Sequence, residues 1–576
     1  MLPPRLPLSR RSTLAGLAGG VIGVGLPAAA HAGARGQVAL RVAAAPFLHG
    51  VASGDPDATS VVLWTRISTD QRDKVTVDWE LAADEGFARL IASGQVETGP
   101  EQDFTVKIMA TGLPAGTQFW YRFHALGATS MPGRTRTLPS GRLDRLGIAL
   151  ATCSNYAFGF FNAYDAIARD PSVDFVLHTG DYIYEYGAQE WGGDVAARIG
   201  RGHQPAHEIV SLADYRQRHA QYKTDPGAQA MHAAHPLLAC WDDHESANNP
   251  WVGGAQNHQP ETEGSWQDRR AASVRAYFEW MPMREPEATA HPQRSRMQFW
   301  RQYRFGDLAT LVTLETRHTA RARQIDYGDY EQVIATQADA DKMVRDVIGA
   351  PGRTMLAAEL EADLDAALRR SVGEGQTWRL IGNPMPIART RVPDVVGQGL
   401  LPDPFAVPNS STAAKALAWK GKWNLPFYTD TWDGYDWARE RLYDLARSAG
   451  ADDLVFLTGD SHSFWANQLA DASGRPAGIE LGAAGITSPG DFVDSGFGPA
   501  LSQQLDRAFE AHNPEVLWSD NMHQGYVRLD MARRTAVATF VAVDTVTSPV
   551  YRTTTLKRFK LSQTGQQLEI SELAGD

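Results

Sequence analysis

Six short apolar runs beyond residue 145 each end on polar side chains of types that bind metal ions or phosphate groups. The runs are residues 147–155, 173–181, 236–245, 308–317, 378–383 and 454–462. Their end residues include Cys153, Asn155, Asp181, Asp242, Asp243, His244, Glu245, Arg317, Asp460 and His462. In open α/β sheets ligands bind beyond the carboxyl ends of the strands, so we expect these ends to converge on one crevice.

The residue types at these ends suit a mixed metal site. Several carboxylates are hard oxygen ligands, which favour Ca²⁺ or Mg²⁺, whereas a thiolate with an imidazole and a phenol suits iron or zinc. Two metal ions about 3.5–4 Å apart can clamp a phosphate and lower the pKa of bound water from about 15.7 to about 7. The hydroxide formed in this way would be the nucleophile, so no Ser or Cys nucleophile is required.

The spacing of the apolar residues predicts two kinds of folded region. Between residues 45 and 138, Val75, Val77 and Leu81 lie on one face of an alternating run, and turns rich in Gly, Pro and Asp separate such runs. This pattern predicts a small antiparallel β-sandwich. From residue 145 to 565, apolar strands alternate with helical stretches such as 356–370, which predicts an α/β fold. Further alternation at 526–545 predicts antiparallel strands that complete a second sheet, so that two sheets pack between helices.

Residues 1–32 predict an export signal. Arg10 and Arg11 precede a weakly apolar run, and Ala30-His31-Ala32 is an A-x-A cleavage site. The paired arginines fit a twin-arginine signal, which implies the twin-arginine export machinery as a partner and a periplasmic or secreted location. The apolar run is shorter than the ~20 residues that span a membrane, so we expect no transmembrane anchor.

The overall composition is that of a soluble globular protein, and 576 residues are enough for at least two domains. A net charge of −12 argues against broad binding of a nucleic-acid backbone, which requires clustered Lys and Arg. It does not exclude a small phosphorylated ligand held by metal ions. The chain has two cysteines, Cys153 and Cys240, so a disulfide framework is ruled out. One disulfide between them is the alternative to a ligand role for Cys153.

Five sequence blocks, in this order, resemble the alkaline phosphatase D family: ATCSNYAFGFFNAY, HTGDYIYEYG, WDDHE, TDTWDGY and GDSHSFW. The stretch GVASGDPDATSVVLWTRI resembles that family's N-terminal domain, so the resemblance runs from about Pro46 to the C-terminus. It implies a metallophosphoesterase-like β-sandwich core flanked by helices at residues 145–565, similar to purple acid phosphatases. It also implies a fibronectin-III-like sandwich at residues 45–138. The implied activity is hydrolysis of phosphate monoesters or diesters by a metal-bound hydroxide.

The resemblance further implies a centre that holds Fe³⁺ with one or two Ca²⁺, while Zn²⁺ or Mg²⁺ stay possible. Asp181 matches the carboxylate shared by both metals, and Asp242 or Asn248 are alternatives to Asp243 as a ligand. The matched ligands are Cys153, Tyr184 and His462 on the iron side, Asp243 and Asp460 on the calcium side, and Asp181 between them.

Three further residues are candidates for contact with the substrate. His244 matches a histidine that stabilises the leaving group or holds a phosphate oxygen; the alternative is support of a metal ligand. The guanidinium of Arg317 suits two phosphate oxygens, and Asn155 is expected to approach the substrate. Glu315 departs from the family, which usually has Asp there. We expect the Gly- and Pro-rich segments 185–206 and 390–411 to form loops over the site that set which phosphoesters enter.

The expected substrate is a small organic phosphoester, with a phosphomonoester preferred, or a phospholipid. A phospholipase D-type phosphodiesterase is therefore an alternative within the same chemistry. An alternative of another class is an exported binding protein that keeps the metal site without turnover. That class predicts a missing shared carboxylate or iron-side ligand, and neither is missing here. A sulfatase-like hydrolase is disfavoured, because the cysteine of CSNY lacks the sequence setting of that class.

Overall fold

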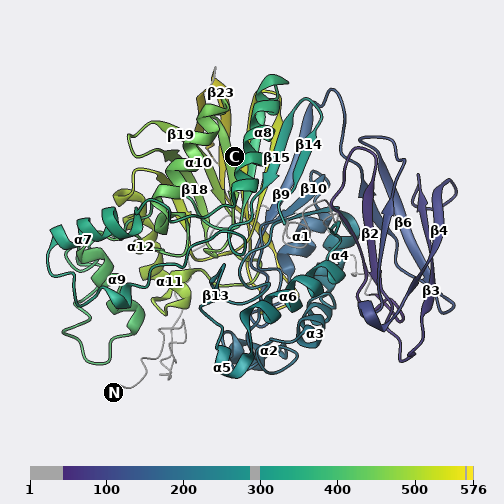
Figure 1. Cartoon of the computed structure of the whole chain (residues 1–576), viewed down its shortest axis with the longest axis horizontal. Coiled ribbons are helices and arrows are strands. Elements are labelled where there is room, and N and C mark those ends of the chain that lie inside the picture. Colours follow the sequence, from purple (N-terminus) through teal and green to yellow (C-terminus); the bar gives the residue numbers. More distant parts are fainter. Residues whose placement is uncertain (1–42, 286–298, 565–566, 575–576) are drawn as a thin grey trace, which may run out of the picture.

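The computed structural model describes residues 43–285, 299–564 and 567–574 (Figure 1). The strands of these residues form two large sheets, a five-stranded sheet and a two-stranded one. The predicted export signal at residues 1–32 lies outside the described residues. In the described part of the chain, no helix is both long enough and apolar enough to cross a membrane.

The largest sheet of the described chain has ten strands. In spatial order they are β24 (Gln567–Glu572), β23 (Thr553–Thr564), β22 (Thr535–Val543), β21 (Gln524–Ala532), β9 (Arg145–Ala151), β10 (Phe175–His178), β11 (Leu237–Ala239), β1 (Val51–Gly54), β2 (Val61–Arg66) and β5 (Thr105–Ala110). The seven-stranded sheet consists of β14 (Gln302–Phe305), β15 (Ala309–Thr313), β16 (Trp378–Asn383), β17 (Leu454–Thr458), β19 (Pro476–Gly482), β18 (Phe464–Ala470) and β20 (Val516–Asp520).

All six apolar runs that end on polar residues contain strands, as predicted. β9, β10 and β11 are parallel neighbours in the ten-stranded sheet, with Leu177 opposite Leu150. β15, β16 and β17 are parallel neighbours in the seven-stranded sheet, with Ile381 opposite Phe456. The six strands are thus divided equally between two sheets. Because parallel strands end at the same edge of a sheet, each sheet delivers three loops to one side.

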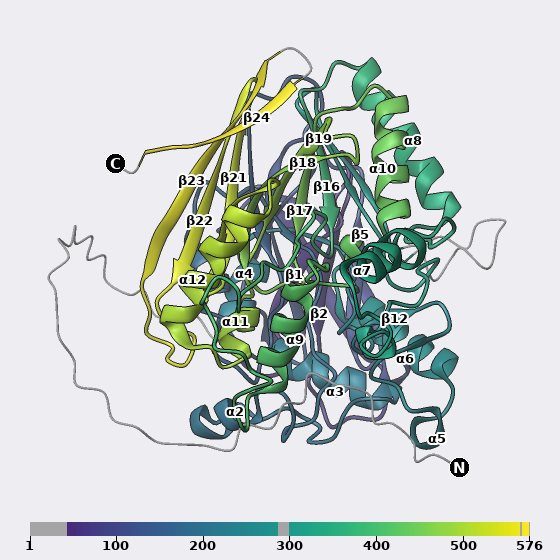
Figure 2. The ribbon, with the colours of Figure 1, turned by 90° about the vertical axis from the view of Figure 1, so that its left-hand side faces the viewer.

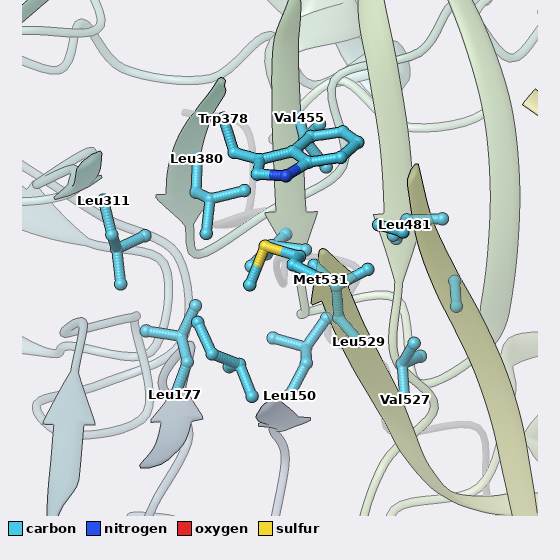
Figure 3. Packing of buried hydrophobic residues seen from close by; sticks show 14 of the residues in the cluster. Leu150, Leu177, Leu311, Trp378, Leu380, Val455, Leu481, Val527, Leu529 and Met531 are labelled. Carbon is cyan, nitrogen blue, oxygen red and sulfur yellow. The ribbon is translucent and has the colours of Figure 1, made fainter. Parts of the chain in front are cut away.

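The two large sheets pack face to face (Figure 3). Successive side chains of a strand point to opposite faces of its sheet, so every second side chain can enter the space between the sheets. Leu150 of β9 and Val455 of β17 point into the space between the sheets. Their neighbours Ala149 and Phe456 point the other way, toward helices. β9 and β17 are therefore buried on both faces.

Helices pack on the outer faces of β9–β11 and of β15–β17, which gives a mixed α/β fold as predicted, and Figure 2 shows α8 and α10 beside the second of these groups. On the side of β9–β11 these are α1 (Asn162–Arg169), α3 (Leu212–Tyr222), α4 (Pro226–Ala234) and α6 (Trp266–Trp280). On the side of β15–β17 they are α8 (Ala358–Gly373) and α10 (Asp436–Ser448). The connections contain α2 (Gly193–Ile199), α5 (Pro260–Glu263), α7 (Gln337–Met343), α9 (Thr412–Lys422), α11 (Asp491–Asp494), α12 (Gly498–His512), β12 (Pro250–Trp251) and β13 (Gly254–Ala255).

The C-terminal strands lie in a different sheet from the one that we expect from the sequence. The alternating run at 526–545 forms β21 and β22 as predicted, but these strands extend the first sheet instead of completing a second one. β21 pairs antiparallel with β9, with Val527 opposite Leu150. This register places Val527, Leu529 and Met531 in the core between the sheets, which is the burial that their spacing requires (Figure 3).

The N-terminal strands pack in two layers, and one layer belongs to the largest sheet. β1, β2 and β5 cover a five-stranded sheet, and Leu63 and Val106 meet Val77 and Phe123 between the layers. That sheet contains β4 (Leu90–Thr98), β3 (Val75–Ala82), β6 (Gln118–Ala125), β7 (Ala128–Thr129) and β8 (Gly133–Arg136). β1 also pairs in parallel with β11, so these strands continue the sheet that positions the candidate site.

Candidate metal centre

The loops that follow β9, β10, β11 and β17 bring the predicted ligand side chains together at the edge where both sheets end. Their ligand-type atoms form three overlapping groups, and within each group all the atoms lie within 4.8 Å of one another. The groups are Cys153 with Asp181 and His462, Asp181 with Asp243 and His244, and Asp181 with Asp242, Asp243 and Asp460. Asp181 belongs to all three, and every member is buried.

Strained turns direct these side chains away from the strands. Cys153, Asp181, Asp460 and His462 all have a positive φ, between 56° and 64°. Residues other than Gly seldom adopt this left-handed conformation, which costs about 1–2 kcal/mol per residue. Four such residues around one point indicate that the surrounding fold holds the turns in place.

On the thiol side, three different ligand types surround one carboxylate. Oδ2 of Asp181 lies 3.5 Å from Sγ of Cys153 and 3.1 Å from Oη of Tyr184. Oη of Tyr184 is also 3.2 Å from Nε2 of His462. The indole of Trp191 stacks on the His462 ring at 5.5 Å between centroids. The predicted iron-side residues are therefore in mutual contact.

On the carboxylate side, Arg317 lies among three acids. Its Nε donates to Oδ1 of Asp242 at 2.6 Å. Its Nη2 is 3.6 Å from Oδ1 of Asp243 and 3.4 Å from Oδ1 of Asp460. The guanidinium is completely buried, so its charge is directed at these carboxylates and not at solvent.

The chain itself balances the charges of the centre only in part. Burial raises the pKa of Asp243, but His244 and Arg317 outweigh it, so its net pKa is lowered. Burial and then the charges of Asp243 and Asp242 raise the pKa of Asp181 well above its ordinary value. Burial also raises the pKa of Asp242, although Arg317 opposes the shift. For Cys153 and Tyr184, burial and then the charge of Asp181 raise the pKa. A cation bound here would reverse the upward shifts, because it favours the ionised form of every ligand.

Two buried oxygen atoms of the centre have no hydrogen-bond partner among the described residues: Oδ2 of Asp242 and Oδ1 of Asp243. Buried polar atoms are nearly always paired, so such atoms indicate a site for a missing ion or water. Thiol, phenol, imidazole and carboxylate groups are all metal ligands. The residues present therefore fit a metal centre.

His244 is held in place by Glu185, which is not among the predicted site residues. Nδ1 of His244 is 2.6 Å from Oε2 of Glu185, and the imidazole stacks on the Tyr184 ring at 4.3 Å between centroids. Nε2 of His244 lies 3.9 Å from Oδ2 of Asp243. Glu185 directly follows Tyr184 within the block HTGDYIYEYG. Its position in this block is the one feature of the sequence that could have identified it as a site residue.

The PhoD-like phosphatase family matches residues 148–540 of this chain, and the N-terminal domain of PhoD-like phosphatases matches residues 31–139. The chain belongs to the PhoD-like phosphatase family. It is 34% identical to alkaline phosphatase D of Bacillus subtilis (strain 168) over 523 residues, which covers 88% of this chain and 79% of that relative. A solved structure of PhoD superposes with a TM-score of 0.73 and 29% identity, and covers 92% of each chain.

This PhoD-like phosphatase is accordingly a phosphoester hydrolase of a metal-dependent family, as the sequence blocks predicted. Both of its cysteines are free and buried, so the alternative of a Cys153–Cys240 disulfide finds no support. The side chain of Asn248 donates to Oε1 of Gln256 at 3.0 Å. Asp243 belongs to two of the three ligand groups, and Asp242 belongs to one.

In the PhoD-like phosphatase, the side chains of Asn155 and Glu315 bond to backbone groups of nearby residues. Oδ1 of Asn155 accepts from the backbone N–H of Ala157 at 3.0 Å, and the side chain is buried. The carboxylate of Glu315 accepts the backbone N–H groups of Arg317 and His318, at 2.7 and 2.6 Å. The acid at this position therefore shapes the turn that presents the Arg317 guanidinium.

The two Gly- and Pro-rich segments of the PhoD-like phosphatase differ in their relation to the centre. Segment 185–206 carries Trp191, whose Nε1 donates to Oδ1 of Asp494 at 3.0 Å while its ring covers His462. Segment 390–411 packs Val392 and Leu401 against α9 and α12. Of these two segments, 185–206 provides a wall directly over a predicted ligand.

Proposed function

We propose that this PhoD-like phosphatase is an exported enzyme that hydrolyses phosphate monoesters, and diesters in addition, at a centre of two kinds of metal ion. Fe³⁺ would lie on the thiol side and Ca²⁺ on the carboxylate side. The observation that carries the proposal is Asp181, which belongs to every group of ligand atoms. One carboxylate between two sets of ligands is the arrangement that allows two cations to act on one phosphate.

Different residues of the chain would bind the cations, hold the phosphoester and neutralise charge. When bound, the cations would supply the positive charge that activates water and neutralises the phosphoryl oxygens. His244, fixed by Glu185, would hold a phosphoryl oxygen or the leaving group. The contacts of Arg317 with Asp242 and Asp460 support a role in neutralising the carboxylate side. Its contact with phosphate, and that of Asn155, remain predictions.

Replacing the shared carboxylate tests the centre. In Asp181→Asn we expect loss of bound metal, measured by plasma mass spectrometry, and a rate of hydrolysis lowered at least about a hundredfold, since even supporting residues of metal sites are worth about 10–100-fold. Asp444→Asn, on the exposed face of α10, is the matched control. Full metal content and activity in Asp181→Asn would contradict the proposal.

The ester preference requires a direct comparison. The purified chain is incubated with a phosphomonoester, a phosphodiester and phospholipid vesicles, before chelation, after chelation and after return of Ca²⁺. We expect chelation to abolish hydrolysis and Ca²⁺ to restore it, with the monoester cleaved fastest. Faster cleavage of the phospholipid would favour the phosphodiesterase alternative, and no turnover by metal-loaded protein would favour the binding protein.

Export is proposed from Arg10, Arg11 and the A-x-A site at Ala30–Ala32. Replacing both arginines by lysine keeps the charge and removes the twin-arginine motif. We expect this variant to accumulate inside the cytoplasm, which fractionation and immunoblotting would detect. Unchanged export would exclude the twin-arginine route.

We also propose a specific fold for each of the two regions of the chain. Two sheets packed face to face between helices support a metallophosphoesterase-like core at residues 145–565. The two layers formed by β1–β8 support a fibronectin-III-like domain at residues 45–138. Limited proteolysis that cuts first between residues 138 and 145 would support this boundary, and resistance there would contradict it.

A further inference from the structure

The segment Thr487–Pro489 follows β19 and crosses the thiol side of the centre without supplying any predicted ligand. Oγ of Ser488 lies 2.9 Å from Oη of Tyr184 and 3.1 Å from the carbonyl oxygen of Cys153. The carbonyl oxygen of Pro489 lies 3.1 Å from Nδ1 of His462. Thr487–Pro489 thus contacts the side chains of Tyr184 and His462 and the backbone of Cys153.

We propose that Thr487–Pro489 is a positioning element that orients the thiol, the phenol and the imidazole of the metal centre together, with Ser488 as its central residue. The inference rests on the proposed function, because it requires that this side of the centre holds a metal ion. It goes beyond that function by assigning a role to residues outside the ligand set.

The first contact fixes the turn that carries the thiol. Cys153 has a φ of 57°, a conformation that a residue with a side chain adopts only when its surroundings impose it. Its carbonyl oxygen is 3.5 Å from the backbone nitrogen of Thr487 and 3.4 Å from that of Ser488. These N–H groups hold the turn from one side, so Sγ is directed toward Asp181.

The second contact acts on the phenol. An oxygen that binds a metal ion gives up its proton, so Oη of Tyr184 becomes a pure acceptor when it is a ligand. The hydroxyl of Ser488 has a single proton. The carbonyl oxygen of Cys153 is already approached by backbone N–H groups, so the Ser488 proton is available to Tyr184 at 2.9 Å. Ser488 therefore holds the phenol oxygen in the orientation of a ligand.

The third contact selects the nitrogen of the imidazole that faces the centre. Nδ1 of His462 lies 3.1 Å from a carbonyl oxygen, which can only accept, so Nδ1 carries the proton. Nε2 is then the unprotonated nitrogen, and it is the one that lies 3.2 Å from Oη of Tyr184. Ligand histidines are commonly oriented in this way through their other nitrogen.

The segment is itself held rigidly. The backbone N–H of Ile486 donates to the carbonyl oxygen of Thr152 at 2.9 Å, and Oγ1 of Thr487 donates to that of Asn155 at 2.7 Å. A side chain at Gly485 would place its Cβ 2.6 Å from the carbonyl oxygen of Ser488, so the turn requires glycine there. Ser488 is completely buried. Packing of this kind is what a positioning element needs.

The test uses the full chain loaded with Fe³⁺ alone, and it compares Ser488→Ala with two controls. Ser463→Ala removes a buried hydroxyl next to His462 that bonds Asn521 and the carbonyl oxygen of Ser461 but no predicted ligand. Ser488→Thr keeps the hydroxyl. The readouts are the chelator concentration that removes half of the iron and the charge-transfer absorption band, with Tyr184→Phe marking the phenolate contribution to that band.

We expect Ser488→Ala to lose iron at about 10–100-fold lower chelator concentration and to shift the band, whereas both controls stay close to the unmodified protein. Ser488→Ala with unchanged retention and an unchanged band would overturn the inference while leaving the proposed function intact. An unmodified chain that binds no iron would instead overturn the proposed function. If thermal unfolding shows that Ser488→Ala is not folded, Ser488→Cys replaces it, because cysteine keeps the size of the side chain with a weaker donor. We expect Ser488→Cys to lose iron at a chelator concentration between those of Ser488→Ala and the unmodified protein. Unchanged iron retention in Ser488→Cys would overturn the inference.

Discussion

Glu185 holds His244 in a single orientation because its two carboxylate oxygens have different partners. Oε1 accepts the backbone N–H of Asn248 and Nδ2 of Asn257, both at 2.8 Å. Oε2 faces Nδ1 of His244 at 2.6 Å. Burial raises the pKa of Glu185, but the charge of His244 and these hydrogen bonds outweigh it, so the net pKa is lowered. The ionised carboxylate therefore keeps a proton on Nδ1 of His244 and directs Nε2 toward Asp243.

This geometry predicts a specific effect of Glu185→Gln. The two donors that face Oε1 require an acceptor, so the amide oxygen takes that place and the amide NH₂ faces His244. Nδ1 must then accept, which restricts the imidazole to the neutral form with its proton on Nε2. We expect kcat to fall about 10–100-fold with KM little changed, measured by steady-state kinetics.

Asn257→Ala is the control for that variant, because it removes one donor to Oε1 and leaves the pair of Glu185 with His244 intact. The position of the proton on His244 can be followed by ¹⁵N NMR of the imidazole. Equal losses of kcat in Glu185→Gln and Asn257→Ala would show that Glu185 acts only through packing.

At the scale of the elements, glycines allow the strand ends to approach one another. Gly180 precedes Asp181 with a φ of 107°, and a Cβ there would lie 2.2 Å from Cβ of Asp242. Gly459 precedes Asp460, and a Cβ there would lie 2.3 Å from Oγ1 of Thr152. The loop after β10 thus meets the loop after β11, and the loop after β17 meets the end of β9. The carboxylates that follow are close because these glycines have no side chain.

Gly180→Ala is therefore expected to disturb both the fold and the centre. The left-handed backbone costs about 1–2 kcal/mol, and overpacking adds about 1–3 kcal/mol. Gly474→Ala isolates the first effect, because that turn residue has a φ of 83° and open space around it. Urea denaturation and metal content measure the two effects. A free-energy loss in Gly180→Ala no larger than in Gly474→Ala, with full metal content, would contradict the argument.

The six strands could be predicted from sequence because each is an apolar run that stops at a polar residue, which is a local pattern. The assignment of strands to sheets could not, since it depends on pairs far apart in the chain, such as Val527 with Leu150 and Gly54 with Leu237. This is why the C-terminal strands were expected in the wrong sheet.

The same difference between local patterns and long-range contacts explains which site residues could be predicted from the sequence. Asp181, Tyr184 and His462 lie in blocks whose order along the chain can be compared with a family. Glu185 and Ser488 matter through partners that the fold supplies, 59 and 304 residues away along the chain. Neither spacing nor residue type signals such contacts.

At the scale of the whole molecule, the buried Lys223 lies at a seam between β2 and the helices α3 and α4. Nζ of Lys223 is 3.1 Å from Oη of Tyr182 and 3.2 Å from Nε2 of His232. It also lies 5.0 Å from the ring centre of Trp64 on β2. Neither ring nitrogen of the nearby His219 has a hydrogen-bond partner among the described residues. Burial lowers the pKa of His219, His232 and Lys223, so the seam favours the neutral form of these bases.

The seam makes the stability of the fold depend on pH. Burial lowers the pKa of Lys223 from its ordinary 10.5 to about 7. Between these values the unfolded chain binds a proton on Lys223 that the folded chain does not, so the free energy of unfolding rises with pH. For one proton the slope is about 1.4 kcal/mol per pH unit, and the penalty is complete below about pH 7.

Lys223→Met should remove that slope, because it fills the same space without a titrating group. Denaturant unfolding of chelated protein between pH 7 and 10 measures the slope, and Lys422→Met, at an exposed position on α9, should leave it unchanged. The neighbouring His232, whose pKa burial and then Lys223 lower, titrates below this range. A slope that Lys223→Met does not alter would mean that Lys223 stays charged in the folded protein, with its ammonium held by Tyr182 and the ring of Trp64.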